Sequence, residues 1–258
     1  MFLNLAAYQF IAIDDPDALA DTLRARAEAG SLRGSVLVAG EGINLFLAGA
    51  DAAIDGFVAW LREDPRFADI AAKYSRSNTR PFGRLKVKRK REIISFRRDD
   101  ASPLRARAPA VTPSTLARWI AQGHDDEGQR LVLLDTRNRE EVRHGTFDGA
   151  ATLPIDRFTD LPEAVLAQRD ALRDATVVSF CTGGIRCEKA ALWMRANGFA
   201  DVLQLDGGIL AYFEQVGGAG YGGACFVFDQ RVALDPALRP VGEHAARTDG
   251  VPCAHTTG

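Results

Sequence analysis

The chain has 258 residues, 47% of them apolar and 26% charged, a composition that excludes a collagen, a coiled coil and a low-complexity scaffold. Its length favours two compact domains, and its apolar runs fall far short of the roughly 20 residues that span a bilayer, so no membrane span is expected. The net charge of −2 conceals an uneven distribution, because residues 1–112 hold 18 basic and 14 acidic residues whereas residues 113–258 hold 14 and 20.

The first part of the chain follows the order of a ferredoxin-like fold. Residues 3–10 predict a strand and lack the basic leader of an export signal, so the default compartment is the cytoplasm. Asp15 and Pro16 supply the cap and first turn of a helix that Gly30 ends. Strands at 34–38 and 43–47, an amphipathic helix over 51–63 and a strand over 69–75 follow. This order is the split βαβ pattern of a ferredoxin-like α+β domain.

A linker separates this first domain, residues 1–98, from a second. Between Arg97 and Pro113 the sequence has three prolines and no apolar period, which predicts a linker over 99–112. Residues 113–235 alternate between strands, at 131–135, 176–180 and 202–205, and helices, at 114–121, around 140, and at 161–172, 187–197 and 209–216. Such alternation predicts a mostly parallel sheet covered on both faces. Residues 236–258 are polar and aperiodic and predict a flexible tail.

Cys181 is the strongest candidate for a catalytic residue. It follows an apolar strand and precedes a helix, so it lies at the carboxyl edge of the sheet, where α/β proteins bind ligands. Gly183 and Gly184 let backbone N–H groups turn toward the sulfur, and the start of the helix points at the same place. With a basic residue nearby, the loop predicts a thiolate or persulfide anion in a cradle formed by Thr182, Gly183, Gly184, Ile185 and Arg186.

The sequence leaves alternatives open for the roles of several cysteines and of Asp135. The four cysteines, with Cys253 in the tail, are too few for a disulfide framework. A small core residue is the weaker interpretation of Cys181, because two glycines and an arginine follow it. Cys187 either resolves an oxidised Cys181 or, as its place in a helix favours, is a packed residue. Cys225 is expected in the core. Asp135 is an accessory group at the active loop or, more in keeping with its position, a helix cap or ion-pair partner.

Two further motifs accompany this loop. They are Leu-Leu-Asp-Thr-Arg-Asn at 133–138 and Gly-Thr-Phe-Asp-Gly-Ala at 145–150. Together with the loop at 181–186 they resemble a rhodanese domain, whose active loop presents a persulfide-forming cysteine. Related phosphatases place five residues between their cysteine and arginine, whereas four separate Cys181 from Arg186. Phosphatase and arsenate reductase activities are therefore disfavoured.

The resemblance is closer to one subgroup. Its motifs are Cys-Thr-Gly-Gly-Ile-Arg-Cys-Glu-Lys at 181–189, Asp-Thr-Arg-Asn at 135–138, Leu-Asp-Gly-Gly-Ile-Leu at 205–210, Cys-Phe-Val-Phe-Asp-Gln-Arg-Val at 225–232 and Gly-Glu-Gly-Ile-Asn at 40–44. Together these are similar to the TrhO (YceA-like) family of rhodanese-domain tRNA uridine hydroxylases. The resemblance implies a ferredoxin-like α+β domain before a rhodanese-like parallel-sheet α/β domain, with Cys181 as the essential cysteine. It also implies an oxidoreductase that converts uridine at the tRNA wobble position to 5-hydroxyuridine, with molecular oxygen as co-substrate.

No bound cofactor is evident from the motifs. A Gly-x-Gly-x-x-Gly fingerprint for a flavin or nicotinamide does not follow any predicted strand, and the four histidines lack the spacing of an iron site. Members of the family usually carry a glycine where Leu45 stands, and many end in a cysteine-rich tail of which only Cys253 remains. We therefore expect neither a metal site nor a cofactor.

A basic segment precedes the linker, because residues 73–98 hold eleven basic residues and a single acid, Glu92. Strict alternation over 84–88 predicts a strand with its basic residues on one face and its apolar residues on the other. Such a run is often a solvated face or a charge-protected edge strand. With the family resemblance, we expect it to bind the phosphates of a tRNA anticodon stem-loop through Arg84, Lys86, Lys88, Arg89, Lys90 and Arg91. Tyr74 and Phe82 are candidates for stacking on a base.

Further alternatives remain at this stage. Glu41 and Asn44 lie on a glycine-flanked turn, where they either contact substrate or serve the backbone only. A persulfide-forming sulfurtransferase acting on small thiols or thiosulfate would use the same active loop without needing the basic segment. A non-catalytic RNA-binding module would use the rhodanese fold as a platform.

Overall fold

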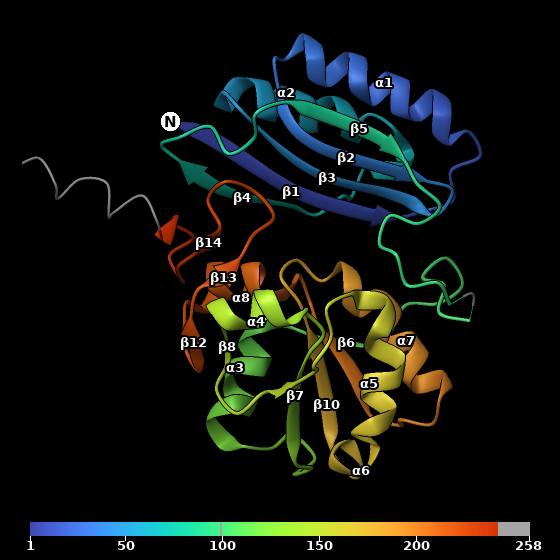
Figure 1. The fold of residues 1–258 in the computed structure, drawn as a ribbon, viewed down its shortest axis with the longest axis vertical. Helices are drawn as coiled ribbons and strands as arrows, with labels where there is room; N and C mark the ends of the chain where they lie inside the picture. The colour runs from blue at the N-terminus through green and yellow to red at the C-terminus, as the bar shows by residue number, and fades with distance from the viewer. Residues whose placement is uncertain (99, 242–258) are drawn as a thin grey trace, which may run out of the picture.

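The computed structural model describes residues 1–98 and 100–241, which form two domains placed one above the other (Figure 1). In the first domain, helices cover one face of a sheet, and the other face is turned toward the second domain. In the second domain, helices lie on both faces of a parallel sheet. This arrangement confirms the predicted fold class, a ferredoxin-like domain followed by a rhodanese-like domain.

The elements predicted for the first domain are present. The largest shift is in the last predicted strand, which begins at Ala72 after a short 3-10 helix. The first helix begins as predicted, because the Asp15 carboxylate accepts a hydrogen bond from the Ala18 N–H at 2.9 Å. The observed elements are β1 (Phe2–Phe10), α1 (Pro16–Ala29), β2 (Arg33–Ala39), β3 (Gly42–Gly49), α2 (Asp51–Arg62), η1 (Pro65–Phe67), β4 (Ala72–Ser77) and β5 (Leu85–Arg89).

The first sheet has the strand order β4-β1-β3-β2-β5. Neighbouring strands are antiparallel except β5, which pairs with β2 in parallel. Alternate residues face the helices and form the core, including Leu45, which is fully buried. Leu85 and Val87 join this core, so Lys86 and Lys88 lie on the opposite face, as the alternation predicts.

The second domain follows the predicted alternation of strands and helices. One predicted helix, over 161–172, is divided at Gln168. The observed elements are β6 (Ala110–Val111), α3 (Pro113–Gln122), β7 (Leu131–Asp135), α4 (Arg139–His144), β8 (Gly145–Phe147), β9 (Ala151–Thr152), η2 (Phe158–Asp160), α5 (Leu161–Ala167), α6 (Arg169–Leu172), β10 (Thr176–Phe180), α7 (Ile185–Ala196), β11 (Val202–Leu205), α8 (Gly208–Val216), β12 (Tyr221–Gly223), β13 (Cys225–Phe226) and β14 (Ala233–Leu234).

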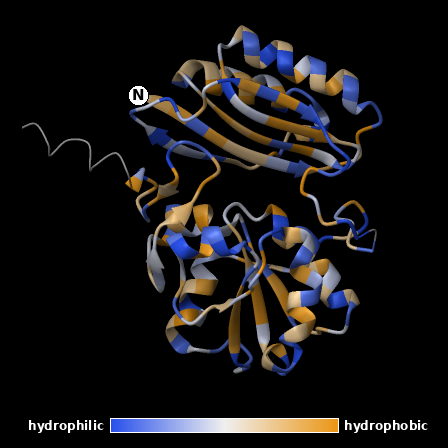
Figure 2. Cartoon of the chain, in the orientation of Figure 1, coloured by the Kyte–Doolittle hydropathy of each residue, from blue (hydrophilic) through white to orange (hydrophobic). Residues whose placement is uncertain are grey.

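The sheet of the second domain has the order β6-β11-β10-β7-β9, and its neighbouring strands are parallel. Its central strands β7 and β10 are hydrophobic along most of their length (Figure 2). Successive residues enter cores on opposite faces, since Leu134 and Val177 pack in one cluster and Leu133 and Val178 in another. Within the described part of the chain, no helix is both long and apolar enough to cross a bilayer.

The structure revises both ends of the second domain. Phe96 and two alanines of the predicted linker, Ala101 and Ala108, are buried in its core, and β6 adds the linker's last residues to its sheet. These isolated apolar residues among prolines and arginines have no period that a sequence pattern would detect. At the other end, the Asp235 carboxylate accepts hydrogen bonds from the Ala237 and Arg239 N–H groups, so the predicted tail begins with an ordered turn. Residues 242–258 lie outside the described part.

Candidate active site

The active loop joins the end of β10 to the start of α7 at the carboxyl edge of the parallel sheet. Gly184 has a φ of 100°, which glycine adopts without strain, and its N–H donates a hydrogen bond to the Cys181 Sγ at 3.2 Å. A Cβ at Gly208, the first residue of α8, would lie 2.5 Å from the Cys181 carbonyl oxygen. These glycines let the backbone wrap closely around the cysteine, and the loop has the geometry of an anion cradle.

Cys181 is fully buried, and its neighbours favour the thiolate. Burial alone would raise the pKa of its thiol, but the Cys187 thiol, the Arg186 charge and the backbone N–H groups outweigh burial and lower the pKa of Cys181 to about 5. Burial and the neighbouring Cys181 raise the pKa of Cys187. At neutral pH the pair therefore holds one thiolate, at Cys181, and one thiol. The thiolate is the nucleophilic form of cysteine.

Arg186 is held in place by a residue that the sequence analysis missed. Its guanidinium donates to both carboxylate oxygens of Glu141 at 2.6 Å, and both side chains are buried. Glu141 also completes the capping box of α4 with Asn138. The Asn-x-x-Glu spacing of that capping box was readable from the sequence, but the contact with the active loop was not. Arg186 thus acts on Cys181 from a fixed, bidentate ion pair.

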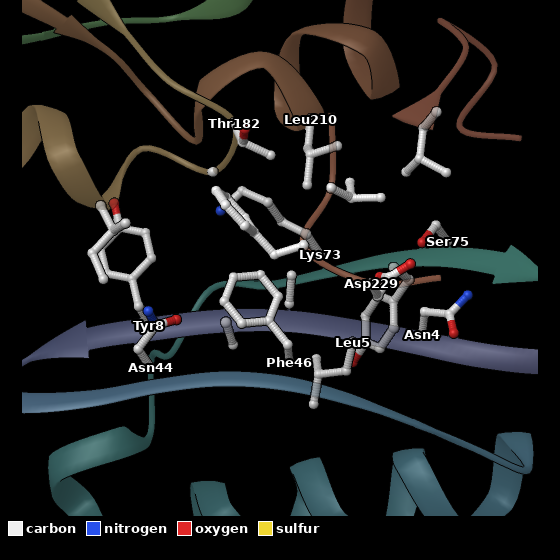
Figure 3. A pocket seen from close by; sticks show the side chains of 18 of the residues that line it. Asn4, Leu5, Tyr8, Asn44, Phe46, Lys73, Ser75, Thr182, Leu210 and Asp229 are labelled. Atoms are coloured by element: carbon white, nitrogen blue, oxygen red, sulfur yellow. The ribbon is translucent and has the colours of Figure 1, made fainter. Parts of the chain in front are cut away.

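A cavity that is partly open to solvent lies between the two domains, and Cys181 is among the residues that line it. A Cβ at Gly184 would lie 2.9 Å from the Tyr8 hydroxyl, so the first domain closes directly over the active loop. Figure 3 looks into the cavity, where side chains from the first sheet face side chains from the second domain. From the sheet come Asn4, Tyr8, Asn44, Phe46, Lys73 and Ser75, and from the second domain come Thr182, Leu210 and Asp229.

The basic strand shares the sheet face that lines this cavity. A row of paired residues runs across the five strands of the sheet: Lys86 of β5, Ser35 of β2, Phe46 of β3, Ala6 of β1 and Lys73 of β4. Paired residues in neighbouring strands point to the same face. The exposed lysines of β5 therefore lie on the same surface as the cavity, at its far edge.

The six basic residues predicted to bind RNA, Arg84, Lys86, Lys88, Arg89, Lys90 and Arg91, are all exposed. Lys86 and Lys88 lie on the face that leads to the cavity, whereas Arg89 forms an ion pair with Asp17 of α1 at 3.2 Å. Both candidates for base stacking, Tyr74 and Phe82, line the cavity. The structure therefore places only part of the predicted basic set on the cavity side.

Comparison with known proteins agrees with this architecture. Residues 2–93 match the family described as UPF0176 acylphosphatase like domain, and residues 113–215 match the Rhodanese-like domain family. The tRNA uridine(34) hydroxylase of Xanthomonas campestris pv. campestris strain B100 is 66% identical over 249 residues, which cover 96% of this chain and 98% of that protein. The chain belongs to the tRNA uridine(34) hydroxylase family. The protein of the same name from Xylella fastidiosa strain M23 is 61% identical over 93% of this chain and 94% of its own length.

In this member of the tRNA uridine(34) hydroxylase family, Lys189 of the second domain forms ion pairs with the first domain. Its side chain is 4% exposed, and its ammonium group donates to the carboxylates of Glu41 at 2.9 Å and Glu92 at 3.0 Å, and to the Ile94 carbonyl at 3.1 Å. Glu41 also accepts from the Ile93 N–H at 2.8 Å. Glu92, the one acid of the basic segment, and Glu41, the acid of the glycine-flanked turn, thus neutralise the charge of Lys189. Sequence reasoning missed this contact because Lys189 lies 97 residues from Glu92 and 148 residues from Glu41 along the chain.

The hairpin formed by β13 and β14 makes a second contact between the domains of this hydroxylase family member. Arg231 forms an ion pair with Asp229 and donates to the Ser75 hydroxyl of β4 at 2.6 Å. The Gln230 N–H donates to the Pro81 carbonyl at 3.1 Å. This hairpin carries Phe228, which is 59% exposed and lines the cavity. The motif at 225–232 therefore positions an aromatic side chain at the cavity mouth.

The two accessory candidates, Asp135 and Cys187, lie outside the lining of the cavity. Asp135 forms a fully buried ion pair with Arg137 and accepts from the Thr146 hydroxyl, which is the partner role that its position favoured. Cys187 is fully buried within α7, and its sulfur lies 3.6 Å from the Thr136 hydroxyl. Neither is among the described residues that line the cavity. Across residues 1–98 and 100–241, no three histidine, cysteine or acidic side chains are grouped to hold a metal ion.

Proposed function

We propose that this protein hydroxylates uridine 34 of tRNA to 5-hydroxyuridine with molecular oxygen as co-substrate, and that Cys181 is its catalytic residue. The observation that carries the proposal is the likeness, over nearly the whole length of both chains, to proteins named tRNA uridine(34) hydroxylase. Because tRNA is the proposed substrate, the cytoplasm is the proposed compartment.

The site geometry supports this chemistry. The Cys181 thiolate lines the cavity. The face of the first sheet that lines the same cavity carries aromatic residues, and it continues to the exposed lysines of β5. A single-stranded loop can turn an unstacked base into such a cavity while its phosphates remain on the basic surface. The anticodon stem-loop is the proposed part of the tRNA, because its wobble base is unpaired in the free molecule.

The sulfurtransferase alternative is not favoured by this arrangement. A persulfide carrier that serves small thiols needs only the active loop of the second domain. Here the first domain supplies much of the cavity wall and contacts the active loop through Tyr8. A non-catalytic RNA platform, in turn, would not need the lowered pKa of Cys181.

The proposed function is tested with the purified protein and an anticodon stem-loop that has uridine at position 34. The reaction is run in isotopically labelled oxygen with a thiol reductant, and the nucleosides are separated and analysed by mass spectrometry. We expect 5-hydroxyuridine carrying one labelled oxygen atom, with no product from Cys181→Ser or from a stem-loop with cytidine at position 34. Incorporation of oxygen from water alone, or full activity of Cys181→Ser, would overturn the proposal.

A further inference from the structure

Two lysines near the domain boundary, the buried Lys189 and the half-buried Lys73, differ in their partners. Lys189 has three oxygen acceptors, as described above. Lys73 of β4 is half-buried and extends over the ring of Tyr8, with its Nζ 5.5 Å from the ring centroid. With the described residues its ammonium group forms no ion pair or hydrogen bond, and its contact there is the face of the Tyr8 ring. Lys189 is therefore satisfied by the protein itself, and Lys73 is not.

Lys73 faces the active loop. Its side chain lines the cavity with Cys181, and its Cε would lie 3.3 Å from a Cβ at Gly207, in the turn before α8. In Figure 3 it lies between the first sheet and the loop that carries Thr182. Burial lowers the pKa of Lys73, and the negative charges that oppose this effect are Cys181 first, followed by Asp206, Glu214 and Glu188.

The ammonium group of Lys73 is in a position to bind an oxygen atom of a ligand. Holding an ammonium group partly out of water without an acceptor costs free energy in the unbound protein, and an oxygen of a bound molecule removes that cost. The nearby walls of the cavity, which include Phe46 and Leu210, are apolar and fit a base better than a phosphate. A carbonyl oxygen of the base is then the acceptor within reach of Lys73.

On the basis of the proposed function, we propose that Lys73 is a second catalytic residue, which binds the C4 carbonyl oxygen of the target uracil while the Cys181 thiolate adds to C6. The bond between Sγ and C6 forms, the electron pair of the C5–C6 double bond moves toward C4, and the negative charge on O4 is held by the ammonium group. C5 thereby becomes the nucleophilic atom that hydroxylation requires.

The addition is reversible and involves no net redox change. C5 of the adduct takes a proton from solvent, the original C5 hydrogen leaves as a proton, and expulsion of the Cys181 thiolate restores the double bond. Exchange of the C5 hydrogen with solvent is therefore a measurable sign of the addition that does not need oxygen.

The test uses the anticodon stem-loop in heavy water under argon, with mass spectrometry of deuterium at C5 of uridine 34. We expect the wild type to catalyse exchange and Cys181→Ser to be inactive. At saturating RNA, Lys73→Met is expected to exchange about 100-fold more slowly, as for loss of one oxyanion donor, and Lys73→Arg to retain part of the rate. Arg118→Met, which removes an exposed charge that does not line the cavity, is the control and keeps the wild-type rate.

Three results would overturn the inference or separate it from the proposed function. Wild-type exchange by Lys73→Met at saturation, with only weaker RNA binding, would make Lys73 a phosphate contact and refute its catalytic role. Formation of 5-hydroxyuridine in air without exchange under argon would refute the addition and leave the hydroxylase function standing. Exchange without hydroxylation in air would support the addition while removing the proposed function.

Discussion

The ion pairs between Lys189 and the first domain should contribute measurably to the stability of the folded protein. Lys189→Met keeps the length of the side chain but removes the charge between Glu41 and Glu92. Removing one partner of a buried ion pair costs about 3 to 5 kcal/mol. Since the two carboxylates are 16% and 15% exposed, we expect the low end, about 3 kcal/mol, which corresponds to a loss of about 1 M in the urea midpoint.

The unfolding free energy lost in Lys189→Met should also depend on pH. In the wild type, burial raises the pKa of Glu92, but the Phe96 N–H and Lys189 outweigh it and lower that pKa, so the native state loses stability as the pH falls through it. In Lys189→Met the two carboxylates repel until one takes up a proton, so the variant gains stability on acidification. The difference in unfolding free energy between the two proteins therefore shrinks from pH 7 toward pH 4.

Urea unfolding monitored by circular dichroism at several pH values tests this prediction. Arg118→Met, which breaks an exposed ion pair, is the control and should cost at most about 1 kcal/mol. Adding Glu41→Gln and Glu92→Gln to Lys189→Met should recover part of the loss, because no unpaired charge then remains. A loss below 1 kcal/mol that does not change with pH would refute the reasoning that Lys189 fastens the domains.

Three further predictions concern the cavity and its surroundings. The alkylation rate of Cys181 by iodoacetamide should rise with pH to a plateau, with a midpoint near 5, because only the thiolate reacts; a midpoint near 8.5 would contradict the geometry of the cradle. Phe228→Ala should weaken binding of the stem-loop by about 1 to 3 kcal/mol in a titration, as for loss of one stacked base, whereas Val232→Ala, at a residue that is 49% exposed and does not line the cavity, should not. Replacing Lys86 and Lys88 by Met should reduce the slope of log Kd against log salt by about 1.4, and an unchanged slope would place the RNA elsewhere.

Local patterns account for most of the fold. Strands β7, β10 and β11 of the second sheet could be predicted because each is a short, mostly apolar run, and β5 because it alternates strictly. The two-residue strand β6 could not, since it lies among prolines and is too short to show a period. Phe96 was assigned to the wrong domain for a related reason, because a single aromatic residue carries no period.

The site was predictable where it is local and not where it is assembled from distant segments. The glycines after Cys181 indicate a cradle on their own, because they stand next to the residue that they serve. Lys73 was counted within a basic run of eleven residues, and nothing in the sequence separated it from the exposed lysines of β5. Only strand pairing shows that Lys73 faces the active loop, at the opposite end of the row from Lys86.

The central claim, that Cys181 performs a tRNA hydroxylation, is tested most directly in cells that lack this protein. Their tRNA nucleosides are measured by mass spectrometry after complementation with the wild type or with Cys181→Ser, at matched protein levels. We expect 5-hydroxyuridine and nucleosides derived from it to disappear on deletion and to return with the wild type alone. Their full return with Cys181→Ser would contradict the claim.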